Sequence, residues 1–202
     1  TVFTGKQGDG KTISMVVHIS ALHRFYPQAK IISNIDLKMI DHIPLLGLNM
    51  LPDLIKEHNN DYAGLIIVID EFQNEMDSTE SKNVSISLLT ELTQLRKQRM
   101  HIVTTSQVFG RLIKPVRQQF KQVVLCRCYF KVLQFNRYGE SYDTEEVEGK
   151  LKINKSALNI WFHKPENYDA YDTYEKIDRS LRKERSYQIT EDLLDEFTAR
   201  TD

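Results

Sequence analysis

The chain carries, close to its beginning, the stretch Gly5-Lys6-Gln7-Gly8-Asp9-Gly10-Lys11-Thr12, whose spacing is G-x-x-x-x-G-K-[ST]. A short β-prone run, Thr1-Val2-Phe3-Thr4, precedes it. Behind it, apolar residues recur at helical spacing from Ile13 to Phe25, and Pro27 ends the pattern. In this order of strand, loop and helix, the backbone N–H groups of the loop and the helix N-terminus bind phosphates. The stretch therefore predicts a nucleotide site.

Each position of this loop has an expected role. Lys11 is expected to reach the β- and γ-phosphates, and the hydroxyl of Thr12 to bind Mg²⁺. The stretch Asn154-Lys155-Ser156-Ala157 lacks the Asp of the guanine-specific N-K-x-D motif, which argues against GTP. The expected nucleotide-binding residues are Gly5, Lys6, Gln7, Gly8, Asp9, Gly10, Lys11, Thr12 and Ile13.

A second signal is the continuous apolar run Leu65-Ile66-Ile67-Val68-Ile69, which predicts a strand buried on both faces of a parallel sheet. Asp70 and Glu71 follow this run directly, which is a Walker B signature. We expect Asp70 to hold Mg²⁺ together with Thr12, and Glu71 to act as the general base that polarises the attacking water.

A third polar strand end follows the apolar run His101-Ile102-Val103-Thr104-Thr105, which is succeeded by Ser106 and Gln107. The carboxyl ends of parallel strands meet the ligand in such sheets, so Gln107 is expected to sense the γ-phosphate and orient water. Our catalytic candidates are therefore Lys11, Glu71 and Gln107.

Length and composition favour one α/β domain over residues 1–202, with a motor core at 1–130 and an edge hairpin and C-terminal extension at 131–202. The longest apolar run is far shorter than a membrane span, and no signal peptide precedes the first strand, so we expect a cytoplasmic protein. In the second half, Tyr129–Asn136 alternates in polarity and predicts an antiparallel edge hairpin with a turn at Arg137–Gly139. The acidic composition of Asp143–Lys152 predicts a loop, and the apolar spacing of Val84–Met100 predicts a helix.

Charge is distributed unevenly along the chain, although the formal net charge is only −1. No Asp or Glu occurs between Leu92 and Gly139. Such an asymmetry favours a polyanion or a complementary subunit face as partner, while basic side chains that simply face water remain the alternative. The basic residues of this window are Arg96, Lys97, Arg99, Arg111, Lys114, Arg117, Lys121, Arg127, Lys131 and Arg137.

Five segments of residues 1–130 together resemble the HerA/FtsK superfamily of P-loop ATPases. Within it they are most similar to the zonula-occludens-toxin-like and viral genome-packaging branch. The segments are Gly5–Thr12, Ser33-Asn34-Ile35-Asp36-Leu37, Val68-Ile69-Asp70-Glu71-Phe72-Gln73, Leu95-Arg96-Lys97-Gln98-Arg99 and Thr104-Thr105-Ser106-Gln107.

This resemblance implies a P-loop NTPase three-layer sandwich of the additional-strand, catalytic-glutamate type, with a mainly parallel sheet. In that fold the strand His101–Thr105 lies between the P-loop strand and the Walker B strand. The resemblance also implies ATP and Mg²⁺ as cofactors, and a homo-oligomeric ring, such as a hexamer, that moves double-stranded DNA. A capsid or membrane-vertex protein is the expected recruiting partner, in the host cytoplasm or associated with the virion.

One set of basic residues follows as candidates from this resemblance, and a second from the basic window. In the family an arginine of one subunit completes the site of its neighbour, and the matching residues are Arg96, Arg99 and Arg117. The residues expected to contact DNA, because they follow the strand that ends at Gln107, are Arg111, Lys114 and Lys121.

Three functions remain open at this point. The first is an ATP-driven DNA translocase, most simply a genome-packaging motor of a virus or mobile element. The second is a motor that assembles or extrudes filamentous virions. The third is a partition-type nucleotide-gated DNA-binding switch, because Lys6 stands where those ATPases carry a signature lysine. The tyrosines Tyr168, Tyr171 and Tyr174 could form a nucleobase wall, a subunit contact or a surface anchor.

Overall fold

The computed structural model describes residues 1–58, 63–76, 99–112, 114–147 and 150–172. The part of the chain up to Asp172 forms one compact unit. Nearly all of the helix expected over Val84–Met100, including Arg96, lies outside the described residues; Arg99 lies in a turn, and Met100 begins a strand. None of the described helices is long and apolar enough to cross a membrane.

One mixed sheet of eight strands organises this unit. The six strands from β7 to β4 run parallel, whereas β8 and β11 are antiparallel to their neighbours. The strand β6 lies between β1 and β5, which confirms the additional-strand type of fold. The antiparallel pairing of β8 and β11 confirms the predicted antiparallel edge. In spatial order the strands are β11 (Ser156–Phe162), β8 (Leu133–Glu140), β7 (Gln122–Tyr129), β1 (Val2–Thr4), β6 (Met100–Ser106), β5 (Leu65–Ile69), β2 (Lys30–Ser33) and β4 (Ile43–Pro44).

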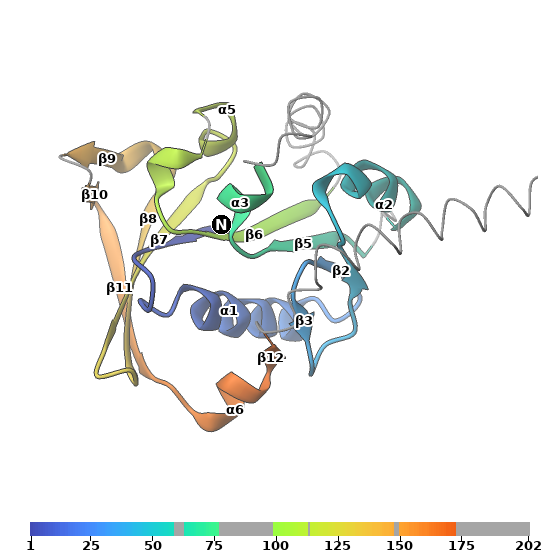
Figure 1. Cartoon of the computed structure of the whole chain (residues 1–202), viewed down its shortest axis with the longest axis horizontal. Helices are drawn as coiled ribbons and strands as arrows, with labels where there is room; N and C mark the ends of the chain where they lie inside the picture. Colours follow the sequence, from blue (N-terminus) through green and yellow to red (C-terminus); the bar gives the residue numbers. More distant parts are fainter. Residues whose placement is uncertain (59–62, 77–98, 113, 148–149, 173–202) are drawn as a thin grey trace, which may run out of the picture. The chain divides into compact units, whose positions relative to one another are not determined.

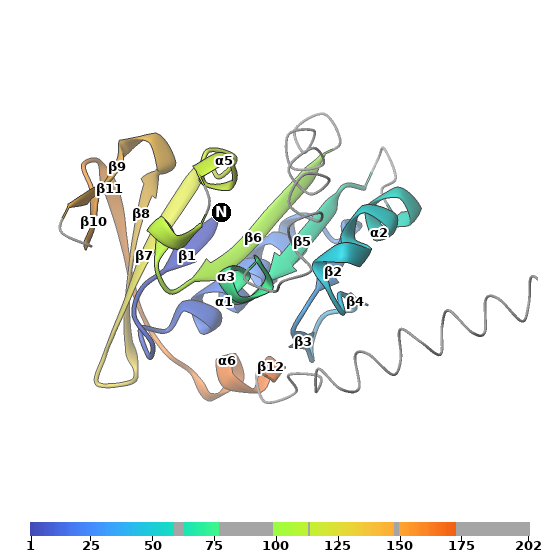
Figure 2. The ribbon, with the colours of Figure 1, turned by 45° about the horizontal axis from the view of Figure 1, so that its top comes forward.

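Helices cover both faces of the parallel part, which confirms the three-layer arrangement (Figures 1 and 2). The helix α1 (Lys11–Phe25) lies on one face, and α2 (Leu51–His58), α3 (Phe72–Met76) and α5 (Lys114–Arg117) lie on the other. The remaining elements are β3 (Asp36–Leu37), η1 (Leu48–Met50), η2 (Phe109–Arg111), η3 (Ser141–Asp143), β9 (Thr144–Val147), β10 (Lys150–Ile153), α6 (Pro165–Asp169) and β12 (Tyr171–Asp172).

The two faces of the sheet carry separate cores because successive strand residues point to opposite sides. Phe3 packs with Met15 and Ile19 of α1 in one core. Val2 packs with Leu51 and other residues in the second. Every residue of β5 is buried, as its continuous apolar sequence predicts for a strand covered on both faces. Because β1, β5 and β6 are parallel neighbours, their carboxyl ends lie at one edge of the sheet.

The predicted edge hairpin is present, but its turn lies elsewhere. The turn joining β7 to β8 contains Phe130 and Lys131, which adopt left-handed φ angles of 54° and 60°. Gly139, expected in the turn, instead pairs with Val123 inside the ladder, and Ile153 packs where a side chain on Gly139 would stand. Gly139 therefore lies within a strand and leaves room for the Ile153 side chain. The periodicity of the sequence alone does not distinguish a glycine packed in this way from a glycine in a turn.

The predicted acidic loop over Asp143–Lys152 is also corrected. Its described residues form the antiparallel pair β9 and β10, in which Lys150 pairs with Val147 and Lys152 with Glu145. The acidic composition had concealed a strand.

Candidate nucleotide site

The loop between β1 and α1 has the backbone conformation of a phosphate cradle. Gly8 and Gly10 adopt φ angles of 83° and 72°, which side-chain-bearing residues rarely reach. The backbone N–H of Lys6 donates to Asp9 Oδ2 at 2.8 Å, and the N–H of Asp9 donates to the Lys6 carbonyl at 3.2 Å. The loop is thus closed on itself directly before α1 begins at Lys11.

The residues expected to hold phosphate and metal meet at the start of α1. Lys11 is buried, and its Nζ donates to the carbonyl of Lys6 at 2.9 Å. The Thr12 hydroxyl donates to Asp70 at 3.1 Å from Oδ1 and 3.4 Å from Oδ2. An ammonium group, a hydroxyl and a carboxylate therefore lie together at the N-terminus of a helix, which is the donor set that fits a Mg²⁺-nucleotide.

Asp70 is held by residues from two neighbouring strands. Thr105, at the end of β6, donates its hydroxyl to Asp70 Oδ1 at 2.6 Å. Asn34, directly after β2, pairs with the Asp70 backbone, accepting from its N–H at 2.7 Å and donating to its carbonyl at 3.0 Å. Burial raises the pKa of Asp70, whereas the hydrogen bonds from Thr105 and Thr12 oppose the rise. A cation at this carboxylate would offset the cost of burying its charge.

Glu71 occupies a strained backbone position beside this carboxylate. Its φ is 51°, in the left-handed region that only glycine enters freely. Its N–H donates to the Thr105 hydroxyl at 2.8 Å, and its Oε2 accepts from the side-chain amide of Asn74 at 2.7 Å. Because Thr105 also bonds Asp70, one hydroxyl sets the relative position of both acidic residues. Strain that surrounding bonds maintain is typical of functional positions.

Gln107 follows the carboxyl end of β6 and is half-buried. The pairing of Thr104 with Ile69 and of Ser106 with Thr4 brings this strand end level with the Asp70 strand and with the start of the loop. The structure thus places Gln107 at the same edge of the sheet as Lys11 and Glu71.

The tyrosines of the C-terminal segment separate around the site. Tyr171 of β12, which pairs with β3, has its pKa raised to about 12 by burial and, secondarily, by the charge of Asp70. Tyr168 of α6 instead contacts His163 and the hairpin turn, where its hydroxyl donates to the Lys131 carbonyl at 3.1 Å. Tyr174 lies outside the described residues.

The antiparallel strand β8 contributes polar residues that the sequence analysis did not select. Gln134 donates through Nε2 to the Asp9 carbonyl at 3.0 Å, and the Ser14 hydroxyl of α1 donates to Asn136 Oδ1 at 3.2 Å. Both amide side chains are buried. The available signal was a pair of amides, Gln134 and Asn136, at alternate positions of the strand, and Asn34 was likewise visible as a polar residue directly after β2.

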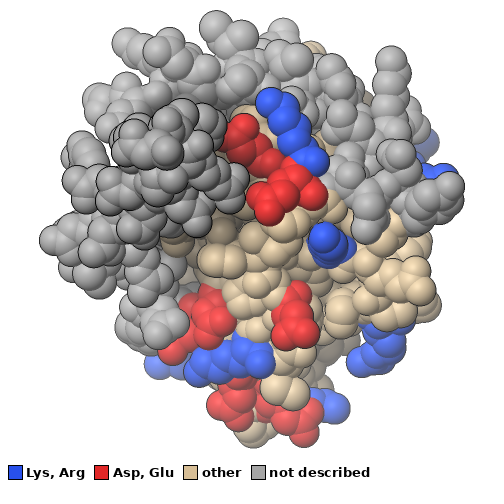
Figure 3. Space-filling view, turned by 90° about the vertical axis from the view of Figure 1, so that its right-hand side faces the viewer, with Lys and Arg blue, Asp and Glu red and all other residues tan. Residues whose placement is uncertain are grey.

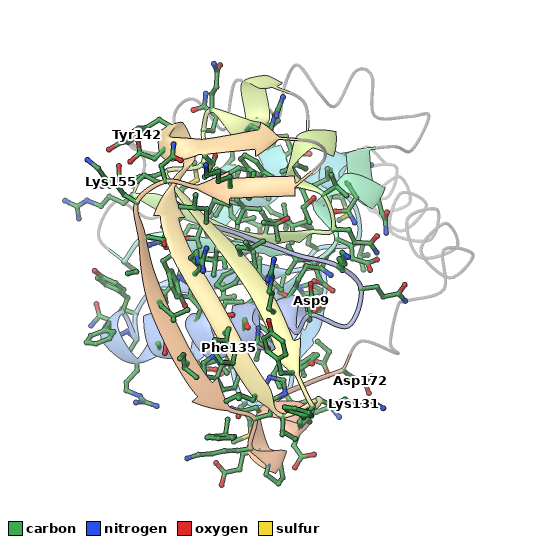
Figure 4. The ribbon with its side chains drawn as sticks, turned by 90° about the vertical axis from the view of Figure 1, so that its left-hand side faces the viewer. Asp9, Lys131, Phe135, Tyr142, Lys155 and Asp172 are labelled. Atoms are coloured by element: carbon green, nitrogen blue, oxygen red, sulfur yellow. The ribbon has the colours of Figure 1, made fainter. Side chains whose placement is uncertain are left out.

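The basic window does not form one continuous face. Lys121 lies just before β7 and Lys131 just after it, so they are separated by the length of that eight-residue strand, about 26 Å. Arg127 and Arg137 lie on the outer face of β7 and β8, where they line a hollow with Phe135 and other residues. Figure 4 shows this side of the sheet, with Lys131 at the hairpin tip. Acidic and basic side chains are interspersed on the opposite side of the molecule (Figure 3).

The candidate arginines and DNA-contacting residues are described only in part. Arg99 is exposed in the turn before β6, and Arg117 ends α5 with its guanidinium 6.0 Å from the Phe109 ring centroid. Arg99 and Lys121 both precede their strands, at the sheet edge opposite the phosphate loop. The backbones of Arg111 and Lys114 belong to η2 and α5, and their side chains lie outside the described part.

Comparison with solved structures identifies the fold. The N-terminal domain of zonular occludens toxin from Neisseria meningitidis matches with a TM-score of 0.58 and 17% identity, over 85% of this chain and 97% of that one. The genome packaging NTPase B204 from Sulfolobus turreted icosahedral virus 2, in complex with ATP-gammaS, matches with a TM-score of 0.50 and 11% identity, over 81% and 96%. The cytoplasmic domain of the Thermomonospora curvata type VII secretion ATPase EccC matches with a TM-score of 0.52 and 14% identity, over 80% of this chain and 23% of that one.

These matches confirm the predicted fold class and, at the level of fold, the resemblance to P-loop ATPases of the toxin-like and packaging kind. No family model matches the chain, and no curated protein matches it by sequence. The chain therefore has the fold of these ATPases at identities where sequence comparison alone finds no relative.

Proposed function

We propose that this chain is an ATP-hydrolysing motor that translocates double-stranded DNA, and specifically a genome-packaging ATPase of a virus or mobile element. The observation that carries the nucleotide part is the contact of Thr12 with Asp70, at 3.1 Å, beside Lys11 at a helix N-terminus. These residues come from two distant stretches, and their meeting forms a site for a phosphate chain and its divalent cation.

The protein's own residues divide the hydrolytic work. The loop N–H groups of residues 5–13 bind the phosphates, and Lys11 neutralises charge on the β- and γ-phosphates. Thr12 and Asp70 would hold Mg²⁺, which would neutralise charge on the phosphates when bound. Glu71 accepts a proton from the attacking water, with Asn74 orienting its carboxylate at 2.7 Å. Gln107 orients that water from the end of β6.

The DNA part of the proposal is supported by charge and by likeness. The window from Leu92 to Gly139 has ten basic residues and no acidic one, and although these residues lie on several surfaces, such an excess of positive charge favours a polyanionic partner. One structure of the same fold is named as a genome packaging NTPase. The motor is proposed to act as a homo-oligomeric ring in which Arg96, Arg99 or Arg117 reaches a neighbour's site. A capsid or membrane-vertex protein would recruit it in the host cytoplasm or at the virion.

Two matched variants test this function. Lys11→Ala removes the phosphate's charge partner, so a fluorescent ATP analogue should lose its tight binding. Glu71→Gln keeps the shape but cannot accept a proton, so it should bind the analogue normally and reduce turnover by about a hundredfold or more. Wild-type phosphate release should rise when duplex DNA is added.

Three outcomes would count against the proposal. Unchanged analogue binding in Lys11→Ala would reject the loop as the nucleotide site. Normal turnover in Glu71→Gln would assign the general base to another residue. Slow hydrolysis that ignores DNA and accompanies nucleotide-dependent dimerisation would replace the motor by a partition-type switch.

A further inference from the structure

A buried amide connects the phosphate loop to the antiparallel edge of the sheet. Gln134 of β8 has no solvent exposure, and its amide group makes three of the described hydrogen bonds. Its Nε2 donates to the Asp9 carbonyl at 3.0 Å and to Asn136 Oδ1 at 2.9 Å. Its Oε1 is 3.0 Å from His163 Nε2. An amide this deeply buried is costly unless it is satisfied, and here both of its ends are.

The contact with Asp9 controls the direction of a peptide group in the loop. A peptide is planar and trans, so its C=O and the following N–H point in opposite directions. Because Gln134 holds the Asp9 carbonyl on the β8 side, the N–H of Gly10 is directed away from β8. That N–H belongs to the loop whose amides are proposed to bind the phosphates.

Gly10 adds a steric part to the same contact. A side chain on Gly10 would occupy the position of the Gln134 amide, so the two residues fit only because Gly10 has no Cβ. Gly10 is also left-handed, with φ 72°. The loop and β8 are therefore complementary at this point in both shape and hydrogen bonding.

A second layer of contacts holds Gln134 itself. Since the Gln134 amide nitrogen donates to Asp9 and Asn136, its Oε1 accepts, and His163 Nε2 must be the N–H donor. The Tyr168 hydroxyl lies within hydrogen-bonding distance of both the other ring nitrogen of His163 and the Lys131 carbonyl at the hairpin turn, and its one proton serves one of them at a time. Figure 4 views the hairpin from outside, with Asp9 and Lys131 labelled. The chain of contacts runs from the turn to the loop.

We propose that Gln134 is a positioning residue for the phosphate loop, and that His163 orients Gln134. The inference rests on the proposed ATPase function for its consequence in catalysis, but not for its effect on the loop. Gln134 does not touch the reacting atoms; it fixes the Asp9–Gly10 peptide in the conformation that presents an N–H group to a phosphate chain.

Three variants test this role. Gln134→Met keeps the volume of the side chain without its hydrogen bonds, and Gln134→Glu keeps the shape but, when ionised, cannot donate to Asp9. His163→Phe removes the second layer from a partly exposed position, where a substitution disturbs less packing than at the fully buried Gln134. The control is Val123→Ala, a buried core residue of β7 on the opposite face of the sheet from α1, which lowers stability without touching the loop.

Two readouts separate positioning from general destabilisation. Hydrogen exchange of the amides of residues 5–12 should quicken by about tenfold in both Gln134 variants, and less in His163→Phe, because one hydrogen bond is lost. The KM for ATP should rise by about the same factor, while Val123→Ala should change neither quantity. Loop exchange and KM in all three variants equal to those of Val123→Ala would overturn the proposal.

The two proposals fail in different ways. If the wild-type protein hydrolyses no ATP but Gln134→Glu still loosens the loop, the proposed function fails and the positioning role stands. If the wild-type protein is active and no variant alters loop exchange or KM, the positioning role fails alone. If neither Gln134 variant folds, unchanged loop exchange and KM in His163→Phe would still reject the contact chain.

Discussion

At the scale of single residues, Asp70 shows how the site is prepared for a cation. Asp70 is half-buried, and this burial raises its pKa although Thr12 and Thr105 donate hydrogen bonds to it. Burial disfavours the charged form more than these bonds favour it. The ionised Asp70 carboxylate at neutral pH therefore lowers the free energy of unfolding, and a divalent cation bound to it would offset that loss.

The first prediction concerns this carboxylate. Because the folded-state pKa lies above the ordinary value, the contribution of Asp70 to the stability of the nucleotide-free protein is fully present below the ordinary value and is lost as pH rises through the interval between the two values. Asp70→Asn removes the ionisation, so its unfolding temperature at neutral pH should exceed that of the wild type by about 2–4 °C for each kcal/mol recovered. Mg²⁺-dependent hydrolysis should be lost.

Differential scanning fluorimetry between pH 4 and pH 8, without nucleotide, measures this effect. The control is Asp41→Asn, which neutralises an exposed carboxylate. An Asp70→Asn protein that melts below the wild type across the whole pH range would show that its hydrogen bonds outweigh its burial.

At the scale of elements, the loop between β1 and α1 depends on a strand from the far end of the sheet. The strand β8 is antiparallel and lies beyond β7, yet it contacts the loop through Gln134. Gly5 adds a contact with β7, because a side chain there would meet the Cys126 carbonyl at 2.7 Å. The nucleotide site is thus supported by the antiparallel edge as well as by the parallel core.

The second prediction compares two glycines of this loop. Gly8→Ala and Gly10→Ala both place a side chain on a left-handed backbone, at φ 83° and 72°, and each should cost about 1–2 kcal/mol for that reason. Only Gly10→Ala also collides with Gln134, since no atom lies within 4 Å of a side chain on Gly8. We expect Gly10→Ala to lose about 1–3 kcal/mol more than Gly8→Ala.

Urea unfolding without nucleotide measures the difference directly, and the two variants serve as controls for each other. Equal losses of stability in both would mean that the loop and β8 separate easily. The double variant Gly10→Ala with Gln134→Ala should recover part of the loss, because the smaller side chain makes room.

At the scale of the whole molecule, the basic window is divided among several surfaces of the described residues. Arg99 and Lys121 lie at the edge of the sheet opposite the phosphate loop, whereas Arg127 and Arg137 line the outer face of the hairpin. A residue at that opposite edge lies far from the phosphate loop of its own chain. In the proposed motor, such positions are candidates for contact with a nucleic acid or with a neighbour's site.

The third prediction concerns DNA. If the basic residues neutralise phosphates, the logarithm of the affinity for duplex DNA should fall linearly with the logarithm of salt concentration, with a slope of about 0.9 for each phosphate contact. Arg111→Gln, Lys114→Gln and Lys121→Gln should each lower that slope by about one unit, without changing sequence preference. Fluorescence anisotropy with a labelled duplex measures it.

The control for this measurement is Lys30→Gln, which removes an exposed lysine outside the basic window. A slope that is the same in all four variants would show that the window serves a partner other than DNA.

The fourth prediction concerns the arginines proposed to act across subunits. An arginine acting in trans can serve a neighbour's intact site, so an Arg117→Ala protein should regain part of its ATPase activity when mixed with Lys11→Ala protein. The same mixing is expected to rescue Arg99→Ala or Arg96→Ala if one of those is the acting residue. Glu71→Gln mixed with Lys11→Ala is the control, because a general base works only in its own site and should gain nothing.

The sequence by itself determined the parts of this protein that depend on local spacing. The loop Gly5–Thr12 needs its glycines and its lysine at fixed intervals, and β5 needs a continuous apolar run ending in Asp70, so both could be predicted with their boundaries. The position of β6 between β1 and β5 also followed, through the resemblance those segments carry. The predictions were wrong where the local pattern is ambiguous: periodicity misplaced the hairpin turn, and an acidic composition concealed β9.

Only the tertiary structure decided which distant side chains complete the site. Gln134 meets Asp9 across 125 positions of sequence, and Thr105 meets Asp70 across 35. Such contacts depend on the order in which strands assemble and on the face to which each residue points. The periodicity of the sequence does not contain this strand order. Gln134 would give the same sequence pattern whether its side chain faced solvent or the Asp9 carbonyl of the phosphate loop.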